Sequence, residues 1–69
     1  METSTQAETL RTFADRLDEI AEELVGQLQH PAAAALLGYT PHRMFSLIRK
    51  SREMAGVYRN RANEIEATH

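Results

Sequence analysis

The sequence contains no cysteine and no tryptophan, and only two phenylalanines and two tyrosines among its 69 residues. Without cysteine the chain has neither a disulfide nor a thiolate metal site, and nothing points to an oxidising compartment. No apolar run approaches the roughly 20 residues that cross a bilayer. The first six residues are polar, unlike a signal peptide. We therefore expect a cytoplasmic protein that does not enter a membrane.

Glycine and proline are also scarce, with three and two copies, and they separate long stretches that favour helix. The spacing predicts an all-α single domain over residues 1–69, with a long helix over 5–29, a short helix over 31–37 and a long helix over 41–67. Three helices or a helical hairpin would both satisfy this order. A domain this small buries only about 60% of its unfolded surface, so stabilisation by oligomerisation is expected.

Large apolar residues recur at intervals of three and four along the first segment, which is typical of one buried helix face. They are Leu10, Phe13, Leu17, Ile20, Leu24 and Leu28. Ala7, Ala14 and Ala21 lie seven residues apart beside this stripe, and small residues at that spacing allow a second helix to approach closely. Thr5 followed by Glu8 has the pattern of a capping box, which predicts the start of the helix.

The first helix would be about 37 Å long at 1.5 Å per residue, longer than the core of so small a monomer requires. Part of its stripe is therefore expected to meet a partner chain, giving a homodimer and a helical bundle. The residues predicted for this dimer interface are Leu10, Ala14, Leu17, Ala21, Leu24 and Leu28.

Turn-forming residues punctuate the middle of the chain. Pro31 suits the first turn of a helix, Gly38 suits the left-handed conformation that ends one, and Thr40 followed by Pro41 suits the start of the next. The apolar positions of the last segment again recur every three or four residues. They are Met44, Leu47, Ile48, Met54, Ala55, Tyr58, Ala62 and Ile65.

The segment from Ala33 to Leu47 resembles the helix-turn-helix motif of bacterial and phage DNA-binding proteins. That motif needs a small residue where its two helices cross, for which Ala34 is placed, a turn residue with positive φ at Gly38, and a cap at Thr40. Tyr39 would fill the space between the helices. The resemblance covers residues 31–50 and implies that the helix after the turn reads DNA.

If DNA is the partner, the second helix of the motif presents a polar and basic set of residues to it. The candidate DNA-binding residues are His42, Arg43, Ser46, Arg49, Lys50 and Arg52. Residues 41–69 carry six basic and three acidic side chains, whereas residues 1–30 carry two basic and seven acidic ones. This asymmetry fits a basic half that faces an anion, and it equally fits two halves that lie side by side and neutralise each other.

Two functions follow from these patterns. The first is a small DNA-binding regulator that dimerises through the first helix. The alternative is a helical protein-interaction module, an adaptor, assembly factor or small inhibitor, that forms a hairpin or four-helix bundle and binds no nucleic acid; the apolar Ala32, Ala35 and Leu36 favour it. The sequence has no phosphate-binding glycine loop and no nucleophile–base spacing, so we expect neither an enzyme nor a cofactor or metal site.

Overall fold

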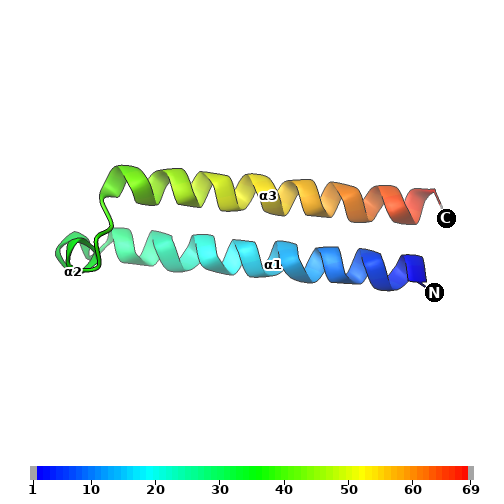
Figure 1. Cartoon of the computed structure of the whole chain (residues 1–69), viewed down its shortest axis with the longest axis horizontal. Coiled ribbons are helices and arrows are strands. Elements are labelled where there is room, and N and C mark those ends of the chain that lie inside the picture. The colour runs from blue at the N-terminus through cyan, green and yellow to red at the C-terminus, as the bar shows by residue number, and fades with distance from the viewer. Residues whose placement is uncertain (1, 69) are drawn as a thin grey trace.

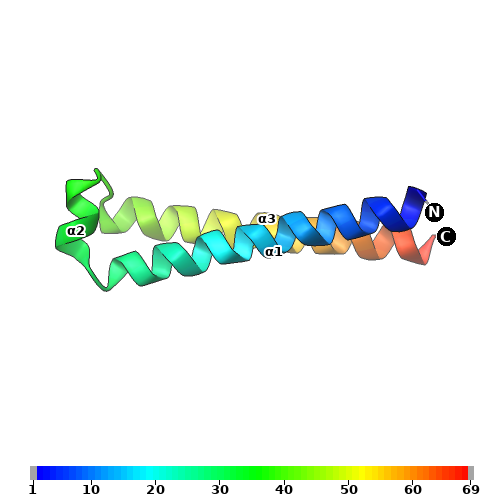
Figure 2. The same ribbon diagram turned by 90° about the horizontal axis from the view of Figure 1, so that it is seen from below.

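The computed structural model describes residues 2–68, and their side chains from Thr5 onward. It contains a long helix α1 (Glu2–Leu28), a short helix α2 (Pro31–Leu36) and a long helix α3 (Pro41–Ala67). α1 and α3 lie side by side and run in opposite directions, with α2 at the end where they are joined and both termini at the other end (Figures 1 and 2). The predicted order of long, short and long helices is therefore confirmed, in the form of a hairpin.

The hairpin is elongated rather than globular, and we refer to its long dimension as the rod. Its backbone measures 49 × 15 × 15 Å and its radius of gyration is 15.3 Å, against about 11 Å for a compact chain of this length. Figure 2 shows the two long helices crossing at a shallow angle along the rod. In this shape each long helix packs mainly against the other, and much of the surface of both remains outside their contact.

Three helix boundaries differ from the prediction. α1 begins at Glu2, so Thr5 lies inside the helix and the prediction that it caps the helix is wrong. Here the Thr9 hydroxyl donates to the Thr5 carbonyl oxygen at 2.9 Å, the bond that threonines make within helices. α1 ends at Leu28 rather than at residue 29, and α2 ends at Leu36 rather than at residue 37.

The corner between α2 and α3 has the predicted chemistry. Gly38 has a φ of 83°, the left-handed conformation that glycine adopts without strain. The Gly38 N–H donates to the Ala35 oxygen and the Tyr39 N–H to the Ala34 oxygen, both at 3.0 Å, which is the Schellman end of a helix. Thr40 then caps α3, because its side-chain oxygen accepts from the Arg43 N–H at 3.2 Å.

Small residues hold α1 and α3 together. Ala7, Ala14 and Ala21 on α1 and Ala55 and Ala62 on α3 are almost completely buried. We call these five residues the alanine seam. Both rows repeat every seven residues, which keeps them facing the opposite helix along the rod. The close approach predicted from the alanine spacing is thus made by α3 of the same chain.

At the end of the seam nearest α2, larger side chains complete the core. Leu24 and Ile48 pack with Ala21, and half-buried residues pack around them; these are Ile20, Val25, Leu28 and Leu47. Met44 and Ala34 are buried near the corner. α3 continues as a helix through Gly56. The core is therefore thin over most of the rod and thickest at one end.

Candidate interaction surfaces

The alanine seam divides the hairpin into two flanks of different chemistry. A residue three positions after a seam residue lies on one side of it, and a residue four positions after lies on the other, because a helix turns once every 3.6 residues. On α1 the first kind are leucines (Leu10, Leu17) and the second kind are charged (Arg11, Asp18). α3 repeats the division with Tyr58 and Ile65 against Arg59 and Glu66, reading from Ala55 and Ala62.

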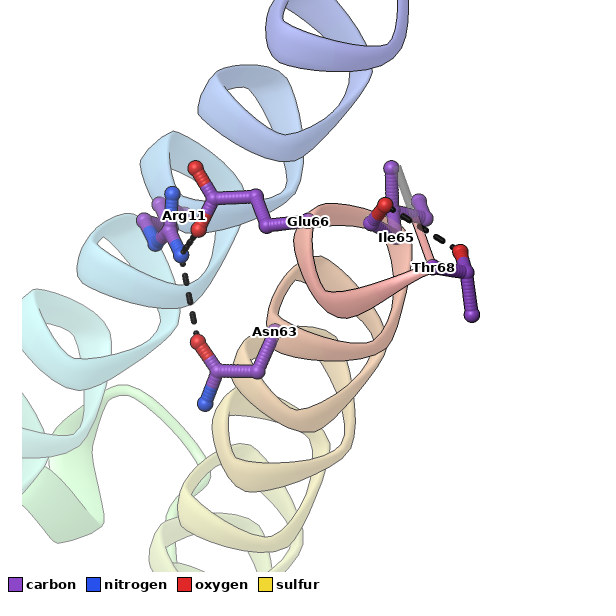
Figure 3. A network of polar contacts seen from close by, with 5 residues as sticks. All are labelled: Arg11, Asn63, Ile65, Glu66 and Thr68. Carbon is purple, nitrogen blue, oxygen red and sulfur yellow. Dashed lines mark hydrogen bonds and ion pairs between the residues drawn. The ribbon is translucent and has the colours of Figure 1, made fainter.

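One of these two surfaces carries the charged residues and is held together by ion pairs between the helices; we call it the charged flank. Arg11 on α1 donates to Glu66 and, at 3.1 Å, to Asn63, both on α3 (Figure 3). The hydrogen bond from Arg11 holds the pKa of the Glu66 carboxyl below its ordinary value. This pair closes the end of the hairpin where the termini lie.

Further along the charged flank the acids are on α1 and the bases on α3. Arg59 donates to Asp15 at 2.8 Å and lies 2.6 Å from Asp18. Arg52 lies 3.6 Å from Glu22. The two halves of opposite charge therefore lie side by side and neutralise each other, as one of the two interpretations of the charge asymmetry predicts. Since all these side chains are partly or largely exposed, each pair contributes little to stability but favours this register of the helices.

The second surface, the apolar flank, carries large side chains on the opposite side of the seam. Its members are Leu10, Phe13, Leu17, Ile20 and Leu24 on α1 and Leu47, Met54, Tyr58 and Ile65 on α3. Phe13 is 53% exposed and Met54 is 37% exposed, and most of the others are half-buried. The Phe13 and Tyr58 rings meet across the helices with their centroids 6.3 Å apart.

The apolar flank is uneven and open to solvent. One hollow of about 270 Å³ is lined by Phe13, Leu17, Met54 and Tyr58 with Arg16 at its edge. A second of about 310 Å³ is lined by Leu10 and Ile65 together with Thr5, Gln6 and Thr9. Unlike the charged flank, this surface has large groups on both helices that contact each other without covering each other.

The six residues predicted for a dimer interface are divided between the seam and its flank. Ala14 and Ala21 are covered by α3 within one chain, and Leu24 is 9% exposed. Leu10, Leu17 and Leu28 are half-buried and still face solvent. Phe13 and Met54 were predicted to lie on apolar helix faces but were not included in the predicted interface. Each directly precedes an alanine of the seam, Ala14 or Ala55, and this position places both beside the leucines.

The candidate DNA-binding residues lie on the first three turns of α3. Five of them are exposed on its outer side, away from α1; they are His42, Arg43, Ser46, Arg49 and Lys50. Arg52 instead turns toward α1 and pairs with Glu22. Beside them an open hollow of about 710 Å³ is lined by His42, Phe45, Ser46, Ile48, Arg49, Arg52 and Glu53. Phe45 is 60% exposed there.

The helices around the corner are arranged with α1 as the common support. α2 packs mainly on α1, and α3 packs on α1 along the rod. Leu36 and Leu37 are 88% and 69% exposed at the tip of the hairpin. The short helix therefore presents apolar side chains to solvent, a feature that the sequence predicted for Ala32, Ala35 and Leu36.

No protein-family model matches this chain, and neither does any curated protein or solved structure. Within the described residues, no group of three or more histidine, aspartate or glutamate side chains is arranged to hold a metal ion. Across those same residues, no helix combines the length and the apolar character needed to span a membrane. The surfaces that bear on function are therefore the two flanks and the outer side of α3.

Proposed function

We propose that this protein is a non-enzymatic helical module that binds another protein chain through the apolar flank. The observation that carries the proposal is the division of the hairpin by the alanine seam. The alanines of the seam pack α1 against α3, while Phe13, Met54 and the other large apolar residues of the flank lie on a face that is open to solvent. An apolar face bordered by polar residues is typical of a protein-binding surface.

The free energy of apolar burial also favours the apolar flank as the binding surface. Each square ångström of apolar surface removed from water contributes about 25 cal/mol, and alanine side chains offer little of it. The leucine, methionine and aromatic side chains offer far more, and within one chain part of it remains exposed, chiefly at Phe13 and Met54. A partner that covers Phe13, Leu17, Met54 and Tyr58 together would gain from apolar burial while displacing no ion pair between α1 and α3.

Site-specific photo-crosslinking tests the proposal with a matched control. A photoreactive phenylalanine analogue replaces Phe13 in one protein and Phe45 in another; the two side chains have similar exposure, 53% and 60%, but only Phe13 is on the apolar flank. Expressed in its host cell, the protein labelled at position 13 should form a defined protein adduct and the one labelled at 45 should not. Equal adducts at both positions, or none at 13, would remove the proposal.

A second candidate function is DNA binding through the outer side of α3. The observation that favours it is the group of five exposed polar and basic residues on consecutive turns, His42, Arg43, Ser46, Arg49 and Lys50, for which no ion pair within the described part of the chain is seen. A helix of this kind can enter the major groove and contact phosphates and bases.

Gel-shift titration against pooled random duplexes at low salt tests this candidate. If DNA is bound, the double substitution Arg49→Ala and Lys50→Ala should weaken binding and reduce the slope of log K against log salt by up to about two. Arg43→Ala should in addition relax base preference. Failure of tens of micromolar protein to shift any duplex would exclude DNA, since even non-specific binders reach about 10⁻⁴–10⁻⁶ M at physiological salt.

A further inference from the structure

We infer that the chain covering the apolar flank is a second copy of this protein, so that two hairpins pair face to face in a four-helix bundle. The inference rests on the proposed function and names its partner. It requires that the flank match itself in size, shape and charge, since a twofold interface uses the same surface on both copies.

The size of the flank fits a stable dimer. The rod is 49 Å long and 15 Å wide between backbone positions, and side chains add to that width. A face of these dimensions approaches the roughly 800 Å² per partner that standard protein interfaces bury. The apolar residues reach along most of its length, from Leu10 and Ile65 near the termini to Leu24 and Leu47 near the corner.

The shape of the flank also favours a two-helix partner. Phe13 on α1 and Met54 on α3 are both more than one-third exposed, so each helix contributes its own row of uncovered side chains. A single helix lying between them would cover the middle of the face and leave the outer parts of both rows in water. A second hairpin presents two rows to two rows, and hairpins of this kind pack readily at the shallow angles of four-helix bundles.

The rims of the flank carry unlike charges at one level of its two helices. Two residues after successive seam positions, α1 carries Arg16 and then Glu23, and the equivalent positions of α3 include Lys50 and Glu64. Arg16 borders the hollow between Phe13 and Tyr58, which places it at the rim. Glu23 and Lys50 hold the same position on their helices, and the pair of Glu22 with Arg52 puts them level along the rod. If α1 faces the second copy's α3 across a twofold axis along the rod, Glu23 approaches its Lys50, and the axis repeats this pair of unlike charges.

Sedimentation equilibrium of the whole chain tests the inference through a matched pair of substitutions. The wild type should be a dimer at micromolar concentration. Phe13→Lys should raise the dimer dissociation constant on the order of 100-fold, because a buried interface would have to accommodate a charge. Phe45→Lys, which makes the same change on the other side of the seam, should leave the dissociation constant within about twofold, as expected of a surface change.

Circular dichroism shows whether each variant retains its helices, and Met54→Lys replaces Phe13→Lys if the latter unfolds. Glu23→Lys should weaken the dimer several-fold at low salt, and Arg49→Glu, on the outer side of α3, should not. A wild type that stays monomeric at hundreds of micromolar overturns the inference. If photo-crosslinking at position 13 then captures a different protein, the proposed function stands without it. A dimer that Phe45→Lys dissociates as strongly as Phe13→Lys also overturns it.

Discussion

The two flanks of the hairpin are built on the same pair of helices and the same seven-residue repeat. They differ in how completely their side chains find partners within one chain. On the charged flank, Asp15 and Asp18 find Arg59 within the chain, and Arg11 finds Glu66. On the apolar flank, Phe13 contacts Tyr58 and remains 53% exposed. One flank has its charges paired within a single copy, and the other keeps large apolar side chains partly exposed.

The two flanks contribute in different ways, one to the register of the helices and the other to apolar burial, and a sequence pattern alone often does not distinguish the two. Exposed ion pairs contribute about 0–1 kcal/mol each, too little to hold a rod together, but unlike charges in the right order disfavour a shifted register. Apolar side chains contribute more when they are covered, and here Phe13 and Met54 remain partly exposed. The alanine seam makes this division possible, because its small side chains let the helices approach closely.

Disrupting the alanine seam should have the largest effect on the free energy of unfolding. Ala14 is completely buried between the helices, so Ala14→Leu inserts a bulky group where α1 and α3 approach closely. We expect destabilisation of about 1–3 kcal/mol from overpacking, measured by urea denaturation. Ala35→Leu makes the same change at an exposed position of α2 and should alter stability little. Equal effects at the two sites would show that the alanines do not set the distance between the helices.

The corner that sets the direction of α3 should be the next most sensitive feature. Gly38 has a φ of 83° and no neighbouring atom within 4 Å of the place a Cβ would occupy, so a substitution acts through backbone strain alone. Gly38→Val should destabilise the protein by about 1–2 kcal/mol. Gly26→Ala in α1, by contrast, should stabilise the protein by about 0.5–1 kcal/mol, because glycine within a helix loses more backbone freedom on folding than alanine does. Thermal melts that place Gly38→Val at or above the wild type would contradict the turn described for residues 37–40.

Breaking the charged flank should have a smaller effect that depends on salt. Arg59→Gln removes the partner of both Asp15 and Asp18. The melting temperature should fall by less than for Ala14→Leu, and the difference from wild type should shrink as sodium chloride is raised from 0.05 to 1 M. A loss that persists at high salt would indicate that Arg59 acts through packing rather than through its charge.

The smallest expected effect is a pH dependence at Glu66. Its pKa is lowered in the folded chain by the hydrogen bond from Arg11, so its ionised form favours folding. The contribution is present above the unfolded pKa and is lost as the pH falls through the folded pKa. Glu66→Gln should therefore melt below the wild type at pH 7, and the two should converge as the solution is acidified through the folded pKa of Glu66. A constant difference over that range would contradict the role of the Glu66 charge.

Much of the fold could be predicted from local patterns. Pro31, Gly38 and Thr40 marked the corner correctly, because turns and caps depend on the conformational preferences of single residues. Thr5 misled, because a threonine followed by a glutamate three residues later also occurs inside a helix that is stabilised by contacts farther along.

The candidate surfaces were harder to predict. A stripe of leucines indicates that a helix face is buried, but not whether it is buried in the same chain or in another. Ala14 and Leu17 were placed together in one interface, whereas the hairpin uses Ala14 internally and leaves Leu17 half-exposed. That assignment follows only once α3 is known to lie on the alanines. The basic residues posed the same problem, since Arg52 reaches an acid on α1 while Arg49, three residues earlier, points away.

The central claim is that the apolar flank becomes covered and the opposite side of the seam does not. Hydroxyl-radical footprinting read out by mass spectrometry measures it directly, through the oxidation rates of Phe13 and Phe45 across a protein dilution series. Their exposures in one chain are 53% and 60%, so their rates should be similar at high dilution. The account predicts that Phe13 becomes protected as the concentration rises while Phe45 keeps its rate. Protection of both rings together, or of neither, would contradict it.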